Sequence, residues 1–140
     1  MRNGNSDYAA GYNSAAKVYR IAVLAAQARV AAAEGKSDAQ IALLRNAVTD
    51  QDQLDYDEPA DWFFPLRHEL GAALLKAGKA SEAEAVYRAD LARNPANGWA
   101  LFGLAQTLHA QGRTADAATA RKQFDAAWTR ADITLAASAF

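Results

Sequence analysis

The sequence predicts an all-α protein, and three observations support that fold class. Alanine, the residue with the highest helix propensity, contributes 37 of the 140 residues. Only three prolines and eight glycines interrupt the chain. Apolar residues in its second half recur at helical spacing, in a pattern that repeats. A β-sandwich needs more β-branched residues and turn signals, a disordered chain has fewer apolar residues, and a disulfide-stabilised mini-protein needs cysteine, which this chain lacks.

The repeat consists of similar residues that stand 34 positions apart. The pairs are Leu70 and Leu104, Gly71 and Ala105, Leu74 and Leu108, Gly78 and Gly112, Lys79 and Arg113, and Ala83 and Ala117. Each period holds two amphipathic segments, so the repeated unit is predicted to be a helix hairpin.

The turn inside each hairpin also has a sequence signature. We expect Gly78 to adopt the left-handed conformation that ends a helix, and Ser81 with Glu84 to form a capping box at the start of the next helix. A second glycine predicts the same arrangement in the first half of the chain, at Gly35, Ser37 and Gln40.

These residues resemble the tetratricopeptide repeat family, a 34-residue helix–turn–helix unit. In the central hairpin the matching residues are Leu70, Gly71, Leu74, Ala83, Tyr87 and Pro95. In the last hairpin they are Leu101, Leu104, Ala105, Leu108, Ala117 and Phe124, although Phe124 stands three residues after the aromatic place of the pattern, which Arg121 occupies. Arg67 and Asp90 depart from the pattern, at its tryptophan place and at a second-helix alanine place.

The resemblance implies how the hairpins pack. Small residues such as Gly71 let the paired helices approach closely, and Tyr87 is expected to fill the gap between neighbouring hairpins. Asn94 and Pro95 should end one hairpin, and Asn97 should cap the next helix. The fold class is therefore three tandem antiparallel hairpins in a short right-handed solenoid.

We predict a single domain over residues 1–140, with hairpins at about 14–48, 62–95 and 97–129, and a C-terminal tail at 130–140.

Gly35 and Gly78 are 43 residues apart, nine more than one period, so an inserted loop is placed at residues 49–61. The loop region is acidic, with Asp50, Asp52, Asp55, Asp57, Glu58 and Asp61. A loop this long is functional or fastened down. Its aromatic end favours fastening, through Tyr56, Trp62, Phe63 and Phe64. The tail is expected to fold back over an exposed edge or to pair with a second chain.

The family resemblance implies a partner-binding groove lined mainly by the first helix of each hairpin. Carrying its positions over gives Arg29, His68, Leu75, Lys76, Trp99, Phe102, Gln106 and His109. Trp99 and Phe102 suggest an apolar anchor pocket; alternatively, the acidic loop or a neighbouring chain covers both. The family's clamp for acidic peptide ends is not supported, because Ala25 and Ala72 stand where it needs long polar side chains.

Charge and motifs exclude several functions. Fifteen basic and sixteen acidic residues without a basic run argue against nucleic-acid binding. No apolar run reaches the length of a membrane span, and the polar start Met1–Asp7 does not read as a signal peptide. We therefore expect a cytoplasmic location, or a periplasmic one if an upstream segment is missing. His68 and His109 should lie roughly 10 Å apart along their helices, too far for one metal ion, and no cofactor motif occurs.

The sequence thus predicts a non-enzymatic module that binds a peptide or partner protein in its groove. The alternative is a structural block that self-associates as a homodimer or belongs to a larger repeat protein. A third hypothesis is a small-molecule or catalytic role where the loop meets the groove.

Overall fold

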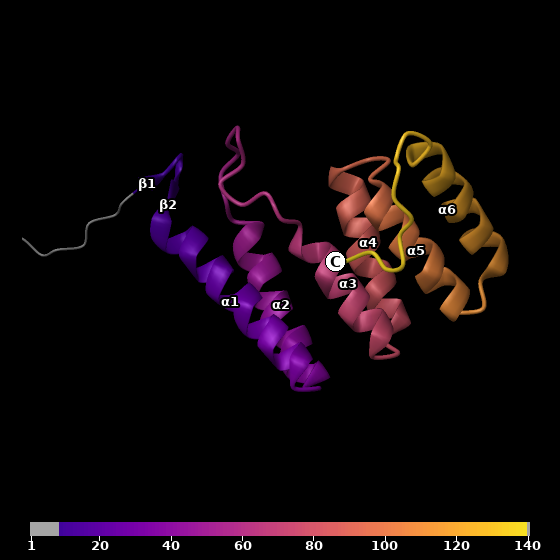
Figure 1. The fold of residues 1–140 in the computed structure, drawn as a ribbon, viewed down its shortest axis with the longest axis horizontal. Helices are drawn as coiled ribbons and strands as arrows, with labels where there is room; N and C mark the ends of the chain where they lie inside the picture. Colours follow the sequence, from indigo (N-terminus) through magenta and orange to yellow (C-terminus); the bar gives the residue numbers. More distant parts are fainter. Residues whose placement is uncertain (1–8, 140) are drawn as a thin grey trace, which may run out of the picture. The chain divides into compact units, whose positions relative to one another are not determined.

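The computed structural model describes residues 9–139, and these contain six α-helices and one short two-stranded ladder (Figure 1). The helices are α1 (Ala15–Ala33), α2 (Ser37–Gln51), α3 (Leu66–Lys76), α4 (Ala80–Arg93), α5 (Gly98–Ala110) and α6 (Thr114–Ala127). The all-α class built from helix hairpins is confirmed. The polar segment Met1–Asp7 and the terminal Phe140 lie outside the described residues.

The chain divides into two compact units, one that ends at Leu66 and one that begins at Arg67. We call them unit 1 and unit 2. The single domain over residues 1–140 and the right-handed course of the whole array stay predictions.

Unit 1 contains the hairpin of α1 and α2. Its buried side chains include Ile21 and Ala28 on α1 and Leu44 on α2. The ladder precedes α1, where β1 (Ala9–Ala10) pairs antiparallel with β2 (Asn13–Ser14). The Ser14 side chain then caps α1 by accepting a hydrogen bond from the Lys17 amide.

The same turn joins the two helices of each hairpin. Gly35, Gly78 and Gly112 have φ of 74°, 75° and 74°. After each glycine, the next amide bonds a carbonyl five residues back; the Lys79 amide, for example, donates to the Leu74 carbonyl at 2.9 Å. This is the Schellman motif, which satisfies the last carbonyls of a helix. The predicted role of Gly78 is confirmed.

The two predicted capping boxes are wrong. Helices α2 and α4 begin at Ser37 and Ala80, and the N-cap residues Lys36 and Lys79 make no side-chain capping bond. The Schellman turn is so tight that only one residue separates the glycine from the next helix. Ser37 and Ser81 therefore fall inside the helices rather than at their caps.

Glu84 links α4 to the last hairpin through hydrogen bonds and ion pairs. Its carboxylate accepts hydrogen bonds from Gln111 Nε2 at 2.8 Å and from Arg113 Nη1 at 2.9 Å, and it pairs with Arg88 at 2.8 Å. These donors favour the charged form, Gln111 most strongly, and lower the pKa of Glu84 to about 2.

Glu84→Gln is therefore expected to remove part of the acid sensitivity of unit 2. A carboxylate whose pKa is lower in the folded chain stabilises it fully above its ordinary pKa, and loses that effect as the pH falls. Here the loss runs from about pH 4.5 down to about pH 2. Thermal unfolding followed by circular dichroism at stepped pH should show a difference in Tm between wild type and variant that is largest near neutrality and disappears near pH 2. Glu34→Gln, in an exposed ion pair, is the control; a pH-independent difference would contradict the assignment.

The core of unit 2 is organised around Tyr87 of α4, which is fully buried. A Cβ on Gly71 of α3 would lie 2.4 Å from its Cζ, and one on Gly103 of α5 would lie 2.3 Å from the same atom. The ring therefore fits between two helices only because both positions lack a side chain. This confirms that Tyr87 fills the gap between neighbouring hairpins and that Gly71 permits a close approach.

The boundary between the two hairpins of unit 2 also follows the prediction. Helix α4 ends at Arg93, directly before Asn94 and Pro95. The Asn97 side chain caps α5 by accepting a hydrogen bond from the Trp99 amide at 3.1 Å.

The C-terminal tail folds back over unit 2. We use this term for residues 129–139, which follow α6 without forming a helix and run back across α5 toward α3 (Figure 1). Leu135 and Ser138 are buried on this path. Of the two predicted outcomes for this segment, folding back is the one observed.

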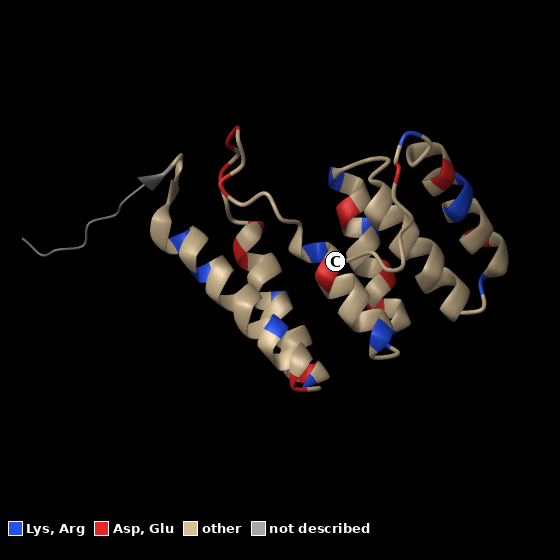
Figure 2. Ribbon diagram, viewed as in Figure 1, with Lys and Arg blue, Asp and Glu red and all other residues tan. Residues whose placement is uncertain are grey.

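The connection between α2 and α3 is acidic at its tip, as Figure 2 shows, and two of its four aromatic residues, Trp62 and Phe64, are half-buried. Tyr56 and Phe63 are 81% and 87% exposed, so the expectation that all four aromatics pack down is wrong for these two. Trp62 is half-buried and donates its indole N–H to the Phe64 carbonyl at 2.6 Å.

Asn13 on the N-terminal ladder also fastens the loop. Its amide donates to the Asp55 carbonyl at 3.0 Å and to the Asp61 carboxylate at 2.8 Å, while its side-chain oxygen accepts from the Asp55 amide at 2.8 Å. The Tyr12 amide adds a hydrogen bond to Asp57 at 3.1 Å. Two of the acidic side chains of the loop are thus structural.

Candidate functional site

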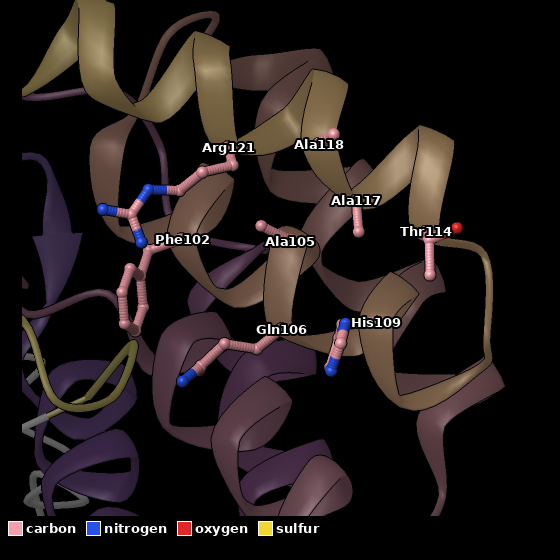
Figure 3. A pocket seen from close by; sticks show the side chains of 8 residues that line it. All are labelled: Phe102, Ala105, Gln106, His109, Thr114, Ala117, Ala118 and Arg121. Atoms are coloured by element: carbon pink, nitrogen blue, oxygen red, sulfur yellow. The ribbon is translucent and has the colours of Figure 1, made fainter.

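Three of the predicted groove residues lie together on α5. Phe102, Gln106 and His109 stand at helical spacing, and with residues of α6 they line a cavity of about 390 Å³ (Figure 3). Gln106 is half-buried and His109 is exposed. The α6 side of the cavity is formed by Thr114, Ala117, Ala118 and Arg121. We call this the α5–α6 cavity.

The α5–α6 cavity combines an apolar floor with a polar rim. Ala105 and Ala117 form part of the floor because their side chains are too small to fill the space between the helices (Figure 3). Arg121 on the rim pairs with Asp125 at 2.8 Å, and its guanidinium lies 5.2 Å from the centre of the Phe124 ring. A site of this composition suits an apolar side chain of a partner with polar groups beside it.

Trp99 and Phe102 are covered by their own chain. Phe102 is 8% exposed, and its ring centre lies 5.3 Å from that of Phe124. Trp99 meets Trp128 edge to face at 5.6 Å, and Leu135 of the tail joins the same cluster. Within unit 2, α6 and the tail thus cover these two side chains.

His68 belongs to a buried polar cluster. Its Nε2 lies 3.4 Å from the Asp90 carboxylate and 3.1 Å from Asn97 Nδ2, and Asn97 also donates to Asp90 at 2.9 Å. His68 and Asp90 are 5% and 3% exposed. Asn94 contacts the other Asp90 oxygen at 3.4 Å. His68 is thus part of the interior of unit 2, where it links α3 to α4 and to the cap of α5.

Asp90 is the residue of this cluster whose role sequence reasoning missed, although a signal was present. It is the aspartate that replaces alanine in the second-helix pattern. A carboxylate at a buried position requires partners, and Asn94, Asn97 and His68 supply them.

The remaining predicted groove residues are not part of the cavity. Leu75 is half-buried and Lys76 is exposed near the end of α3. Arg29 lies in unit 1, where its guanidinium is 5.2 Å from the centre of the Phe64 ring. Within the described residues, no group of three or more His, Cys, Asp or Glu side chains is arranged to hold a metal ion. In the same residues, no helix has the length and apolar character to cross a bilayer.

A comparison with protein families identifies a similarity in the second half of the chain. Residues 70–127 match the tetratricopeptide repeat family, and the predicted resemblance is confirmed for that segment. The match covers α4, α5, α6 and most of α3. A search of curated proteins found no match. The tetratricopeptide repeat is in general a protein-interaction repeat and is typically non-catalytic.

Proposed function

We propose that the segment matching the tetratricopeptide repeat family makes this chain a non-enzymatic interaction module, which binds a peptide or partner protein on the first-helix side of unit 2. The observation that carries the proposal is the α5–α6 cavity, because three of the residues to which the family pattern assigns a groove position line it. Phe102 supplies part of its buried wall, while Gln106 and His109 are accessible to a partner.

The composition of the cavity supports binding rather than catalysis. Interfaces gain most of their affinity from apolar side chains that enter pockets, with polar groups around them. The α5–α6 cavity offers such a pocket between two alanine-lined helices. His109 and Arg121 at its edge favour a partner segment that carries a carboxylate next to an apolar residue.

Site-directed photo-cross-linking tests this proposal, because the chain has no cysteine of its own. We expect His109→Cys, labelled with a thiol-specific photo-cross-linker, to capture a defined partner from an extract of the source cells. Lys122→Cys on α6 is the matched control, since Lys122 is exposed and does not line the cavity. Adding Arg121→Glu to the His109→Cys variant should lower the yield about tenfold, equivalent to about 1.4 kcal/mol of binding free energy. Lys122→Glu, with the same charge change one residue away, should leave it unchanged.

Two results would decide against binding at the cavity. Equal cross-linking from positions 109 and 122 would show that the capture is not specific to the cavity. A cross-link between two copies of the chain would support the self-association alternative. That alternative has an observation of its own, because unit 1 exposes several large apolar side chains: Tyr12, Tyr19, Val30, Tyr56 and Phe63.

A further inference from the structure

The tail covers part of the surface to which the family pattern assigns the groove. It starts after α6, crosses α5 and ends near α3 (Figure 1). Helices α3 and α5 are the first helices of the two hairpins in unit 2. An extended segment of this chain therefore already lies on the side of the unit where we propose that a partner binds.

Leu135 is the first of two buried positions on the tail. It is 9% exposed and packs in a cluster with Leu101, Phe102 and Phe124. Phe102 also lines the α5–α6 cavity. The leucine thus occupies an apolar site directly beside that cavity.

Ser138, three residues later, is the second. It is 1% exposed, its hydroxyl shares a hydrogen bond with the Tyr87 hydroxyl, and it lies 3.5 Å from the His68 carbonyl oxygen. Burial raises the pKa of Tyr87 to about 12, so the phenol keeps its proton and can donate it. The chain of donors then runs from Tyr87 to Ser138 and on to the His68 carbonyl. A small side chain with a hydroxyl group fits this position.

Outside these two positions the tail is held weakly. Residues 131–134 and Ala136 are exposed. Among the described residues, the tail beyond Ala131 forms no backbone–backbone hydrogen bond with a helix; the Trp128 indole donates to the Ile133 carbonyl at 2.9 Å. A cavity of about 260 Å³ remains between α6 and residues 133–135. Because only two of its side chains are buried and a cavity lies beside it, the tail can detach from unit 2 without disrupting the packing of α3, α4, α5 and α6 against one another.

We propose that the tail is a tethered, displaceable occupant of the first-helix face of unit 2. The face takes an extended peptide that presents a leucine and, three positions later, a serine or another small hydroxyl residue. Such a partner competes with Leu135 and Ser138 for the same two positions. This inference rests on the proposed function and specifies its ligand and its regulation.

The test uses the full chain and a fluorescent peptide with the sequence of residues 130–139. In the wild type the tethered tail competes with the peptide at a high effective concentration. If the tail closes the face about nine-tenths of the time, the apparent Kd is about tenfold weaker than that of the open face. Leu135→Asp and the milder Leu135→Ala release the tail, so both variants should bind the peptide at least about tenfold more tightly than the wild type, as measured by fluorescence anisotropy. Ile133→Asp, on the same segment but 51% exposed, should bind like the wild type.

A peptide with the Leu135→Asp change should not bind any form of the protein. The inference is overturned if neither Leu135 variant binds the peptide more tightly than the wild type. It is equally overturned if both variants lose their helical circular dichroism, because the tail is then a fixed part of the core. If the peptide assay fails in either way but His109→Cys still cross-links a partner specifically, the proposed function stands and only the role of the tail is wrong. If the Leu135 variants bind the peptide tightly but His109→Cys captures no partner, partners bind elsewhere than at the α5–α6 cavity.

Discussion

Tyr87→Ala is expected to lower the free energy of unfolding of unit 2 by about 3–5 kcal/mol, the range for truncating a buried aromatic side chain to alanine. The ring lies against Gly71 and Gly103, and its hydroxyl shares a hydrogen bond with Ser138, so its removal leaves a cavity between α3 and α5 and takes away one hydrogen-bond partner of Ser138. Urea unfolding followed by tryptophan fluorescence measures the loss, since Trp99 and Trp128 both lie in unit 2.

The two glycines provide a sharper test of the same arrangement. Alanine normally stabilises a helix by about 1 kcal/mol relative to glycine. Gly103→Ala should instead destabilise unit 2 by about 1–3 kcal/mol, because the added Cβ would overlap the Tyr87 ring. The same substitution in a Tyr87→Ala background should be neutral or stabilising. Stabilisation by Gly103→Ala in the wild type would contradict the packing described for Tyr87.

Phe102→Ala is also expected to lower the free energy of unfolding of unit 2 by about 3–5 kcal/mol, because this side chain packs on Phe124 and Leu135. From the sequence alone, the pair Trp99→Ala and Phe102→Ala is expected to abolish partner binding and leave the helices intact. Because Phe102 is buried, we expect the double variant to remove part of the core, so loss of binding by this variant would not by itself identify a binding site.

The measurement is the helical circular dichroism signal during thermal unfolding. Phe102→Ala should show a clearly lower Tm, while Arg121→Glu, at an exposed position on the same cavity, should unfold close to the wild-type temperature. A wild-type Tm for Phe102→Ala would show that the aromatic cluster does not contribute to stability. In that case Phe102→Ala could be used to test partner binding directly.

Local signals account for the parts of the fold that sequence reasoning predicted correctly. Glycine adopts a φ of 75°, as at Gly78, without strain because it has no Cβ. An asparagine directly before a helix caps that helix, and a proline ends the helix that precedes it. Gly78, Asn97 and Pro95 each act within a few residues. The place of Tyr87 was predictable from the family resemblance, which implies that this residue fills the gap between two hairpins.

The features that were missed depend on contacts between distant parts of the chain. Asn13 fastens a loop more than 40 residues away, and no local pattern marks it. Ser81 and Glu84 have the spacing of a capping box, but the Schellman turn moves the helix start and frees Glu84 for Arg113. The tail reaches its place through two side chains, Leu135 and Ser138, whose partners are 33 and 70 residues away in the sequence.

The candidate site was predicted in part for the same reason. Helical periodicity puts Phe102, Gln106 and His109 on one side of α5, where the cavity lies. The family pattern also assigns His68 on α3 to the groove, but in the structure His68 pairs with Asp90 in the interior of unit 2. The spacing of apolar residues cannot predict a pairing between two polar side chains on different helices.

The turn at Gly35, Gly78 and Gly112 has a consequence for how this chain can change in evolution. Because each turn satisfies the end of one helix and starts the next after a single residue, an insertion there would break both helices at once. The nine residues in excess of the repeat stand between hairpins, after Gln51, where no such constraint acts. Length variation among related sequences should therefore collect between hairpins, while the number of residues inside each turn stays fixed.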